Sequence, residues 1–182
     1  MPRLFTAIEL PPEHRLRLTG LRGGLRNARW IEPENYHITL RFVGDVDDRT
    51  ADDVADALDR VRARDVRIRL KGLGSFGSKK PHSVWARVEP DPALMELQAE
   101  HERLVQRVGL EPERRRFTPH VTVARLKGVS AVDVASWLAV RGDFEAPAFF
   151  APRFVLMSSK ASVGGGPYVV EESYALPFAE AA

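Results

Sequence analysis

Two segments of the chain alternate apolar and polar residues with the period of two that is typical of a β-strand with one buried face. In residues 36–43 the apolar positions are Tyr36, Ile38, Leu40 and Phe42. In residues 120–123 they are Val121 and Val123. We therefore predict two strands that each turn one side toward a hydrophobic core, with Phe42 among the core residues.

Other apolar patterns predict the remaining elements. Short apolar or alternating runs predict strands around residues 4–10, 66–71, 83–88, 154–157 and 168–170. Apolar residues at helical spacing predict helices around residues 18–25, from Asp48 or Thr50 to Arg64, from Asp91 to Gly109 and from Ser130 to Gly142. Residues 72–81, which are rich in Gly and Ser, are predicted to form a loop, and residues 164–167 a turn.

The predicted elements repeat along the chain. The order helix, His-containing strand, helix, strand, strand occurs twice, and His37 and His120 lie 83 residues apart. We interpret this as an internal duplication, roughly residues 11–90 and 91–178, within one α+β domain of residues 1–182. Such a duplication favours a pseudo-two-fold arrangement with the active cleft between two lobes.

Both His-containing strands read His-x-Thr, which places an imidazole and a hydroxyl on the same strand face. His37 and Thr39 form one pair, and His120 and Thr122 form the other. Imidazoles with an ordinary pKa of about 6.5 can act as base and acid within one turnover. Threonine hydroxyls can donate hydrogen bonds to phosphate oxygens whose charge grows in the transition state. If both faces meet at one cleft, the two pairs predict in-line displacement at a phosphodiester.

Composition excludes several other chemistries. The chain has no Cys, which rules out disulfides, thiolate nucleophiles and cysteine metal sites. Neither strand face has a carboxylate beside its His, so we expect no bound metal and no cofactor. The net charge of +2 permits an anionic substrate without requiring one. No apolar run could span a bilayer and the first residues lack a signal-peptide core, so a cytoplasmic location without membrane contact is expected.

The residues around the two motifs resemble a known family, the 2H phosphoesterases, and within it the bacterial RNA 2′,3′-cyclic phosphodiesterases, historically called 2′-5′ RNA ligases. The likeness covers nearly the whole chain and rests on residues 3–11, Trp30, 37–44, 119–125 and 166–168. It implies a bilobal α+β fold with two mainly antiparallel sheets, helices outside and a central cleft. It also implies metal-independent opening of an RNA 2′,3′-cyclic phosphate to a 2′-phosphomonoester, with weak reversible 2′-5′ joining of tRNA halves in some members.

The resemblance assigns roles to the four motif residues. It makes His37 the proton donor and His120 the proton acceptor, with Thr39 and Thr122 binding the substrate phosphate. The spacing of the motifs does not itself decide which His is acid and which is base.

Two arginines compete for a further phosphate-binding role. The resemblance implies Arg125, although strict alternation puts this residue on the face opposite His120, so that a bulge or a twist is needed to bring it into the cleft. Arg41 lies an even number of residues after His37, so strict alternation puts it on the same strand face and favours it as the candidate. Both are retained as expectations.

The expected partner is RNA with a 2′,3′-cyclic phosphate or a 2′-5′ linkage, with tRNA halves as one example, and the chain is expected to be a monomer. The segment 114–117, Arg-Arg-Arg-Phe, could contact RNA phosphates and a base. Two alternatives stay open. One is a phosphodiesterase that acts on a small cyclic nucleotide or on ADP-ribose cyclic phosphate, and the other is a non-catalytic module that binds RNA ends.

Overall fold

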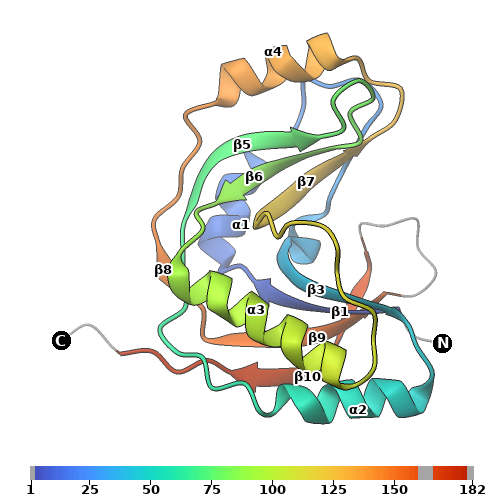
Figure 1. Cartoon of the computed structure of the whole chain (residues 1–182). Coiled ribbons are helices and arrows are strands. Elements are labelled where there is room, and N and C mark those ends of the chain that lie inside the picture. Colours follow the sequence, from blue (N-terminus) through green and yellow to red (C-terminus); the bar gives the residue numbers. More distant parts are fainter. Residues whose placement is uncertain (1–2, 160–165, 180–182) are drawn as a thin grey trace.

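The computed structural model describes residues 3–159 and 166–179, which form four α-helices and ten β-strands (Figure 1). The helices are α1 (Pro12–Thr19), α2 (Asp48–Leu58), α3 (Pro92–Arg107) and α4 (Ala131–Arg141), with a short 3-10 turn at Pro33–Asn35. The strands are β1 (Arg3–Glu9), β2 (Ala28–Trp30), β3 (His37–Asp45), β4 (Arg67–Ile68), β5 (Leu70–Phe76), β6 (Ser83–Val88), β7 (His120–Leu126), β8 (Phe149–Phe150), β9 (Arg153–Ser159) and β10 (Tyr168–Ala175).

One antiparallel sheet organises the molecule. Its strand order is β10-β9-β1-β3-β7-β6-β5, with β2 beside β7, while β4 and β8 form a separate pair. The two His strands, β3 and β7, are joined by a single register pair, Ile38 with Val121. The sheet therefore consists of two halves that diverge from this pair, with α2 and α3 beside the first half and α4 beside the second (Figure 1). The α+β prediction is confirmed, and the two predicted sheets are half-sheets joined at one point.

Corresponding elements of the two sequence repeats, which differ from the two half-sheets, are separated by a constant offset along the chain. β3, α2 and β5 begin at residues 37, 48 and 70, and β7, α4 and β9 begin 83 residues later, at 120, 131 and 153. We infer from this constant offset that the chain arose by internal duplication.

Polar caps fix the starts of three helices. Asp91 accepts a hydrogen bond from the Ala93 amide at 3.1 Å, and Ser130 accepts one from the Asp133 amide at 3.1 Å, as the sequence predicts. The cap of α2 is Asp47, one residue before the predicted start. A capping oxygen satisfies one of the first amides of a helix, which have no partner within it, and so sets the point at which the helix begins.

The prediction of a helix through Leu25 is wrong. α1 ends at Thr19, yet Leu21 and Leu25 are only 5% and 8% exposed. Their spacing reflects burial in the connection that follows the helix, where the apolar side chains still pack into the core.

The prediction of a loop over residues 72–81 is also wrong for its first half, because β5 continues to Phe76. Gly74 lies against the indole of Trp85 on the neighbouring strand, and a Cβ at this position would come within 2.3 Å of the ring. This glycine therefore serves close packing within a strand and does not mark a turn. Of the turn predicted at 164–167, residues 164 and 165 lie outside the described residues.

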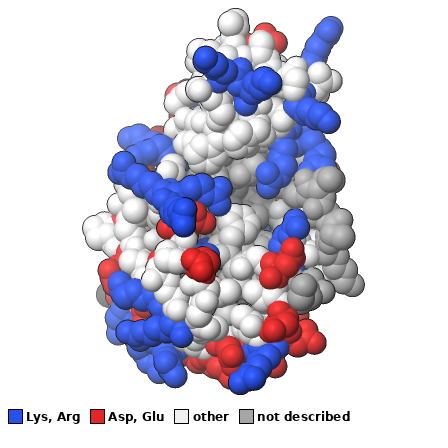
Figure 2. Space-filling model, turned by 45° about the vertical axis from the view of Figure 1, so that its right-hand side comes forward, with Lys and Arg blue, Asp and Glu red and all other residues white. Residues whose placement is uncertain are grey.

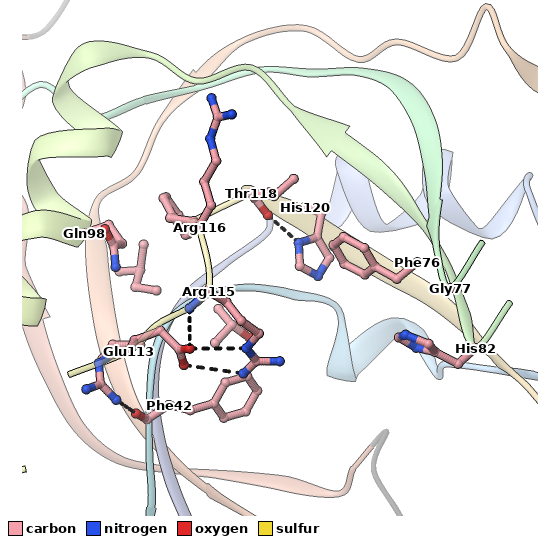
Figure 3. Close-up of a pocket in the computed structure, with 14 residues that line it drawn as sticks. Phe42, Phe76, Gly77, His82, Gln98, Glu113, Arg115, Arg116, Thr118 and His120 are labelled. Carbon is pink, nitrogen blue, oxygen red and sulfur yellow. Dashed lines mark hydrogen bonds and ion pairs between the residues drawn. The ribbon is translucent and has the colours of Figure 1, made fainter. Parts of the chain in front are cut away.

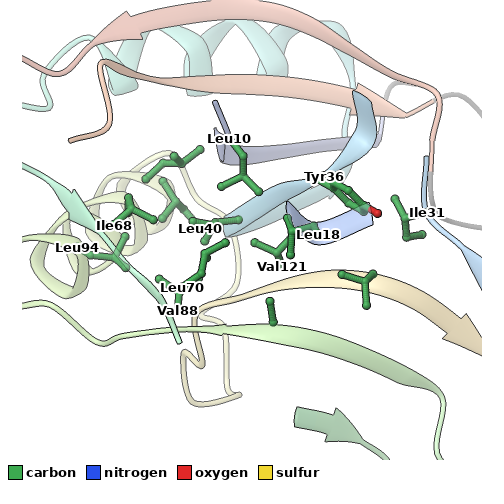
Figure 4. Packing of buried hydrophobic residues seen from close by; sticks show 14 of the residues in the cluster. Leu10, Leu18, Ile31, Tyr36, Leu40, Ile68, Leu70, Val88, Leu94 and Val121 are labelled. Carbon is green, nitrogen blue, oxygen red and sulfur yellow. The ribbon is translucent and has the colours of Figure 1, made fainter. Parts of the chain in front are cut away.

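The core holds the apolar faces of both His strands. Ile38, Val121 and Val123 are fully buried, and Leu40 is 3% exposed. Figure 4 shows Leu40 and Val121 among side chains from α1, β4, β5 and α3. Burial of these alternate positions turns the other positions of β3 and β7 away from the core, which sets the direction of the motif side chains.

Candidate active site

The two His-x-Thr motifs meet at one cleft. His37 and Thr39 of β3 and His120 and Thr122 of β7 are all half-buried and all line a cavity of about 770 Å³. The pairing of Ile38 with Val121 brings the two strands together one residue beyond each His. The convergence that the predicted chemistry requires is therefore present in the structure.

Both imidazoles are held in the same way. The Nδ1 of His37 lies 2.8 Å from the Asn35 carbonyl oxygen, and the Nδ1 of His120 lies 2.6 Å from the Thr118 carbonyl oxygen. Because a carbonyl oxygen can only accept, each Nδ1 carries the hydrogen, and each Nε2 has a lone pair when the ring is neutral. The Nε2 of His37 is 2.9 Å from the Thr39 hydroxyl, which donates to it.

Aromatic rings pack beside each imidazole. His37 lies 5.1 Å from the Phe5 ring and 5.0 Å from the Tyr168 ring. His120 lies 4.9 Å from the Phe76 ring and 5.4 Å from the Trp85 ring. These rings limit the movement of each imidazole and exclude water from one side of it.

Burial lowers the pKa of both histidines. Desolvation lowers the pKa of His37 to about 4, against the opposing effect of its bond to the Asn35 carbonyl, with smaller decreases due to His120 and Arg125. Desolvation and the charge of Arg125 lower the pKa of His120, again opposed by a backbone carbonyl. Both rings are therefore neutral at pH 7 in the absence of an anion, and each can accept a proton at Nε2.

A bulge in each His strand changes which side chains face the cleft. The register between β6 and β7 shifts between Val84 and Trp85, and the face reversal that follows puts Val123 and Ala124 both in the core. Arg125 is consequently exposed and lines the cleft with both histidines. The bulge that the Arg125 expectation required is present.

A matching shift in β3 moves Arg41 to the opposite face. Leu40 and Arg41 are both buried, and Phe42, which follows, is 46% exposed and lines the cleft. The Arg41 side chain is 7% exposed and forms an ion pair with Glu102 of α3. The expectations that Arg41 shares the His37 face and that Phe42 is a core residue are therefore wrong, because alternation does not continue through a bulge.

The cleft continues into a smaller, more apolar part. This part has a volume of about 400 Å³ and is bordered by Phe42, Phe76 and Phe117, with Arg115 and His120 at its edge (Figure 3). The motif threonines, Arg3 and Arg125 lie in or beside the larger part. The cleft thus joins a polar region around the histidines to an aromatic region beside it.

This geometry can be compared with known proteins. The family model described as LigT-like phosphoesterase matches residues 8–86 and residues 88–168. The chain belongs to the LigT-like phosphoesterase family. The resemblance seen in the sequence is thereby confirmed.

Two curated relatives match this LigT-like chain over most of their own length. The RNA 2′,3′-cyclic phosphodiesterase of Aeropyrum pernix is 38% identical over 136 residues, which cover 71% of this chain and 77% of the relative. The RNA 2′,3′-cyclic phosphodiesterase of Aquifex aeolicus is 33% identical over 153 residues, which cover 81% of each protein.

Solved structures show the same fold as this LigT-like chain. The Thermus thermophilus protein TT0787 superposes with a TM-score of 0.78 at 24% identity, covering 96% of this chain and 97% of that one. Escherichia coli LigT in complex with 3′-AMP superposes with a TM-score of 0.77 at 23% identity, covering 97% of this chain and 99% of that one.

The charge around the cleft of this LigT-like chain suits an anion. Arg3, Arg115 and Arg125 line its larger part, and no acidic residue does so among the described residues. Figure 2 shows a hollowed face with Lys and Arg side chains on both sides of the hollow and acidic side chains mainly below it. Oriented cationic side chains of this kind attract phosphate.

Sequence reasoning missed the aromatic walls of the site. Phe5 lies on β1 beside β3 and Trp85 on β6 beside β7, while Phe76 ends β5, the strand after β6, so their contact with the imidazoles depends on strand order. His82 also lines the cleft, where its exposed imidazole stacks beside Phe76. The sequence shows an aromatic residue in each of these strands, but it does not indicate contact with a histidine until the order of the strands in the sheet is known.

Proposed function

We propose that this chain opens 2′,3′-cyclic phosphates at RNA ends to 2′-phosphomonoesters, using the two histidines as acid and base and no metal ion. The observation that carries the proposal is the pair of imidazoles that face one cleft, each with its Nδ1 hydrogen fixed by a backbone carbonyl, which leaves Nε2 as the atom for proton transfer. The curated relatives named for this activity support it.

The proposed reaction is an in-line displacement at phosphorus. Neutral His120 takes a proton from water at Nε2 as the water oxygen bonds to phosphorus. The bond from phosphorus to O3′ breaks, and His37 gives its Nε2 proton to O3′. A 2′-phosphate and a free 3′-hydroxyl result, and exchange with solvent restores both histidines. The choice of donor and acceptor rests on the motif resemblance.

The negative charge of the substrate phosphate favours the protonated form of His37 that the reaction requires. Burial disfavours the protonated form of His37, but a phosphodiester anion beside Nε2 stabilises the imidazolium and raises its pKa. Thr39, Thr122 and Arg125 line the same cavity, and we expect them to hold the non-bridging oxygens as negative charge grows on them. Phosphate binding and acid activation are thereby linked.

Joining of 2′-5′ ends uses the same groups. If an RNA 5′-hydroxyl replaces water as the nucleophile, loss of its proton to His120 and of O3′ from phosphorus leaves a 2′-5′ phosphodiester. We propose weak, reversible ligation of this kind, with tRNA halves as possible ends. The monomeric state and the cytoplasmic location stay predictions; sedimentation of the purified chain and its localisation in cells test them.

A small cyclic nucleotide or ADP-ribose cyclic phosphate is the second candidate substrate, because the motif residues contact only phosphate. The test is product analysis on an RNA oligonucleotide ending in a 2′,3′-cyclic phosphate and, in parallel, on the two small molecules, all with chelator present. The proposal expects a 2′-phosphate on the RNA. Turnover of the small molecules alone would identify them as the substrates. Tight binding of the RNA end without turnover would favour the non-catalytic module.

A further inference from the structure

Arg115 has a place in the cleft that the proposed reaction does not use. Its side chain is 79% exposed and lines both the polar and the aromatic part of the cleft. In the proposed reaction the phosphate is held by Arg125 and the two motif threonines, which line the polar part of the cleft. Its high exposure places Arg115 at the solvent-facing edge of the cleft, where it can meet a part of the substrate beyond the reacting nucleotide.

Glu113 holds the guanidinium in a defined position. Its carboxylate accepts hydrogen bonds from the Arg115 amide at 3.0 Å, from Nε at 3.2 Å and from Nη2 at 3.4 Å. Figure 3 shows this bidentate contact and the guanidinium near Phe42. Among the described residues Arg115 Nη1 has no hydrogen-bond partner, so a donor remains for a ligand.

A largely buried ion pair between Arg41 and Glu102 anchors the loop between α3 and β7, which carries Glu113 and Arg115. Arg41 donates from Nε to Glu102 and from Nη2 to the Glu111 carbonyl, and the second Glu102 oxygen accepts the Glu113 amide at 2.9 Å. Burial raises the pKa of Glu102, but its hydrogen bonds outweigh this effect and hold the pKa below its usual range. Glu102 is therefore charged at pH 7, and its pair with Arg41 ties the loop to β3 and α3.

We propose that Arg115 binds the backbone phosphate preceding the terminal nucleotide of the RNA, and that Glu113, Glu102 and Arg41 position it for this contact. The inference rests on the proposed function and names what in this site selects an RNA chain over a mononucleotide. A guanidinium with a free donor, preset by a carboxylate, forms a charge-assisted bond to phosphate with little loss of side-chain freedom.

The experiment compares two substrates that share their reacting end, adenosine 2′,3′-cyclic phosphate and the adenosine dinucleotide with the same terminus. Arg115→Met should raise the KM for the dinucleotide about tenfold with kcat unchanged, since one charged hydrogen bond is lost. The mononucleotide should be affected less than about twofold, as it has no second phosphate. The slope of log kcat/KM against log salt should fall by about 0.7 for the dinucleotide alone.

Three further variants separate positioning from general damage. Arg107→Met removes the same charge from an exposed position at the end of α3 that lines neither part of the cleft, and it should leave the kinetics on both substrates unchanged. Arg115→Met combined with Glu113→Gln should recover part of the loss, because the unpaired carboxylate no longer repels phosphate. Arg41→Lys keeps the charge but not the forked contacts, and it should raise only the dinucleotide KM.

If Arg115→Met raised the KM equally for both substrates, or left the KM for the dinucleotide unchanged, the inference would be overturned while the phosphodiesterase proposal stayed in place. If the wild type turned over neither substrate, the proposed function would fail. Arg115 is then tested by the fluorescence anisotropy of a labelled dinucleotide 2′-phosphate. Unchanged affinity in Arg115→Met would also overturn the inference.

Discussion

Phe42 and Arg125 occupy equivalent places in the two His strands. Each lies five residues after its His, and each faces the cleft because a bulge reverses the alternation of its strand. The cleft consequently has an aromatic ring on β3 and a guanidinium on β7. The two halves share a backbone plan, but one offers a surface on which a base can stack and the other a charge for phosphate.

Removal of the Arg125 charge should change both rate and titration. Its positive charge lowers the pKa of both His37 and His120, so Arg125→Met should raise both. We expect kcat to fall because a phosphate ligand is lost, and the two imidazole resonances to titrate at higher pH in NMR spectra. Arg26→Met, at an exposed site outside the cleft, is the matched control. Unchanged titration of both rings would show that Arg125 does not act on them.

The threonine hydroxyls should matter mainly in the transition state. Thr39→Val and Thr122→Val keep the side-chain shape and remove the donor, so each should lower kcat by about a hundredfold with a small effect on KM. Steady-state kinetics on the RNA substrate provides the measurement. Thr19→Val, at the end of α1, serves as the control. A rise in KM alone would assign the hydroxyls to ground-state binding.

Local sequence patterns predict the motif faces because each motif is short. Three residues suffice to place His37 with Thr39, and burial of Ile38 between them fixes their direction. The same rule fails two residues later, since the bulge before Phe42 depends on the register with β1. Alternation tells which face of the sheet a side chain lies on only where the pairing between strands is regular. Nothing in the sequence of β3 marks the bulge that interrupts this pairing.

Gly74 shows a second limit of the sequence. Glycine-rich composition is typical of loops, but here the glycine makes room for an aromatic ring from the next strand. Whether a glycine serves a turn or close packing depends on what lies across the sheet, and that is a tertiary property. Helix starts were easier to predict, because a capping side chain and its amide partner are close in sequence.

Gly74→Ala should therefore destabilise the protein. The added Cβ would come within 2.3 Å of the Trp85 ring, and displacement of this ring also disturbs its contact with His120. We expect a loss of about 1–3 kcal/mol in the free energy of unfolding, measured by denaturant titration, together with lower kcat. Ser75→Ala, the next residue in β5, controls for substitution in the strand. Equal stability of Gly74→Ala and wild type would mean that the ring moves freely.

His101 should make the fold sensitive to acid. It is fully buried on α3, with its Nδ1 2.9 Å from the Thr6 hydroxyl, and desolvation lowers its pKa to about 3. Below pH 6.5 the imidazole of His101 binds a proton in the unfolded chain but stays neutral in the folded chain. Its contribution to the free energy of unfolding is therefore complete above pH 6.5 and decreases as the pH falls toward 3.

The expected slope for this one group is about 1.4 kcal/mol per pH unit within that window. Denaturant titrations of wild type and His101→Gln between pH 7 and 5 isolate the contribution of His101, since His37 and other groups are common to both. The variant should be less stable at pH 7 and should lose stability less steeply on acidification. The same pH dependence in both proteins would show that folding does not lower the pKa of His101.

The proposed chemistry requires both histidines and no metal ion. The most direct measurement follows the conversion of a short RNA 2′,3′-cyclic phosphate to its 2′-phosphate, with EDTA present, by wild type, His37→Ala and His120→Ala, each checked for an unchanged melting temperature. We predict that the wild type retains its full rate and that each variant loses at least about a hundredfold. Loss of wild-type activity in EDTA, or near-normal turnover by either folded variant, would contradict two-histidine catalysis.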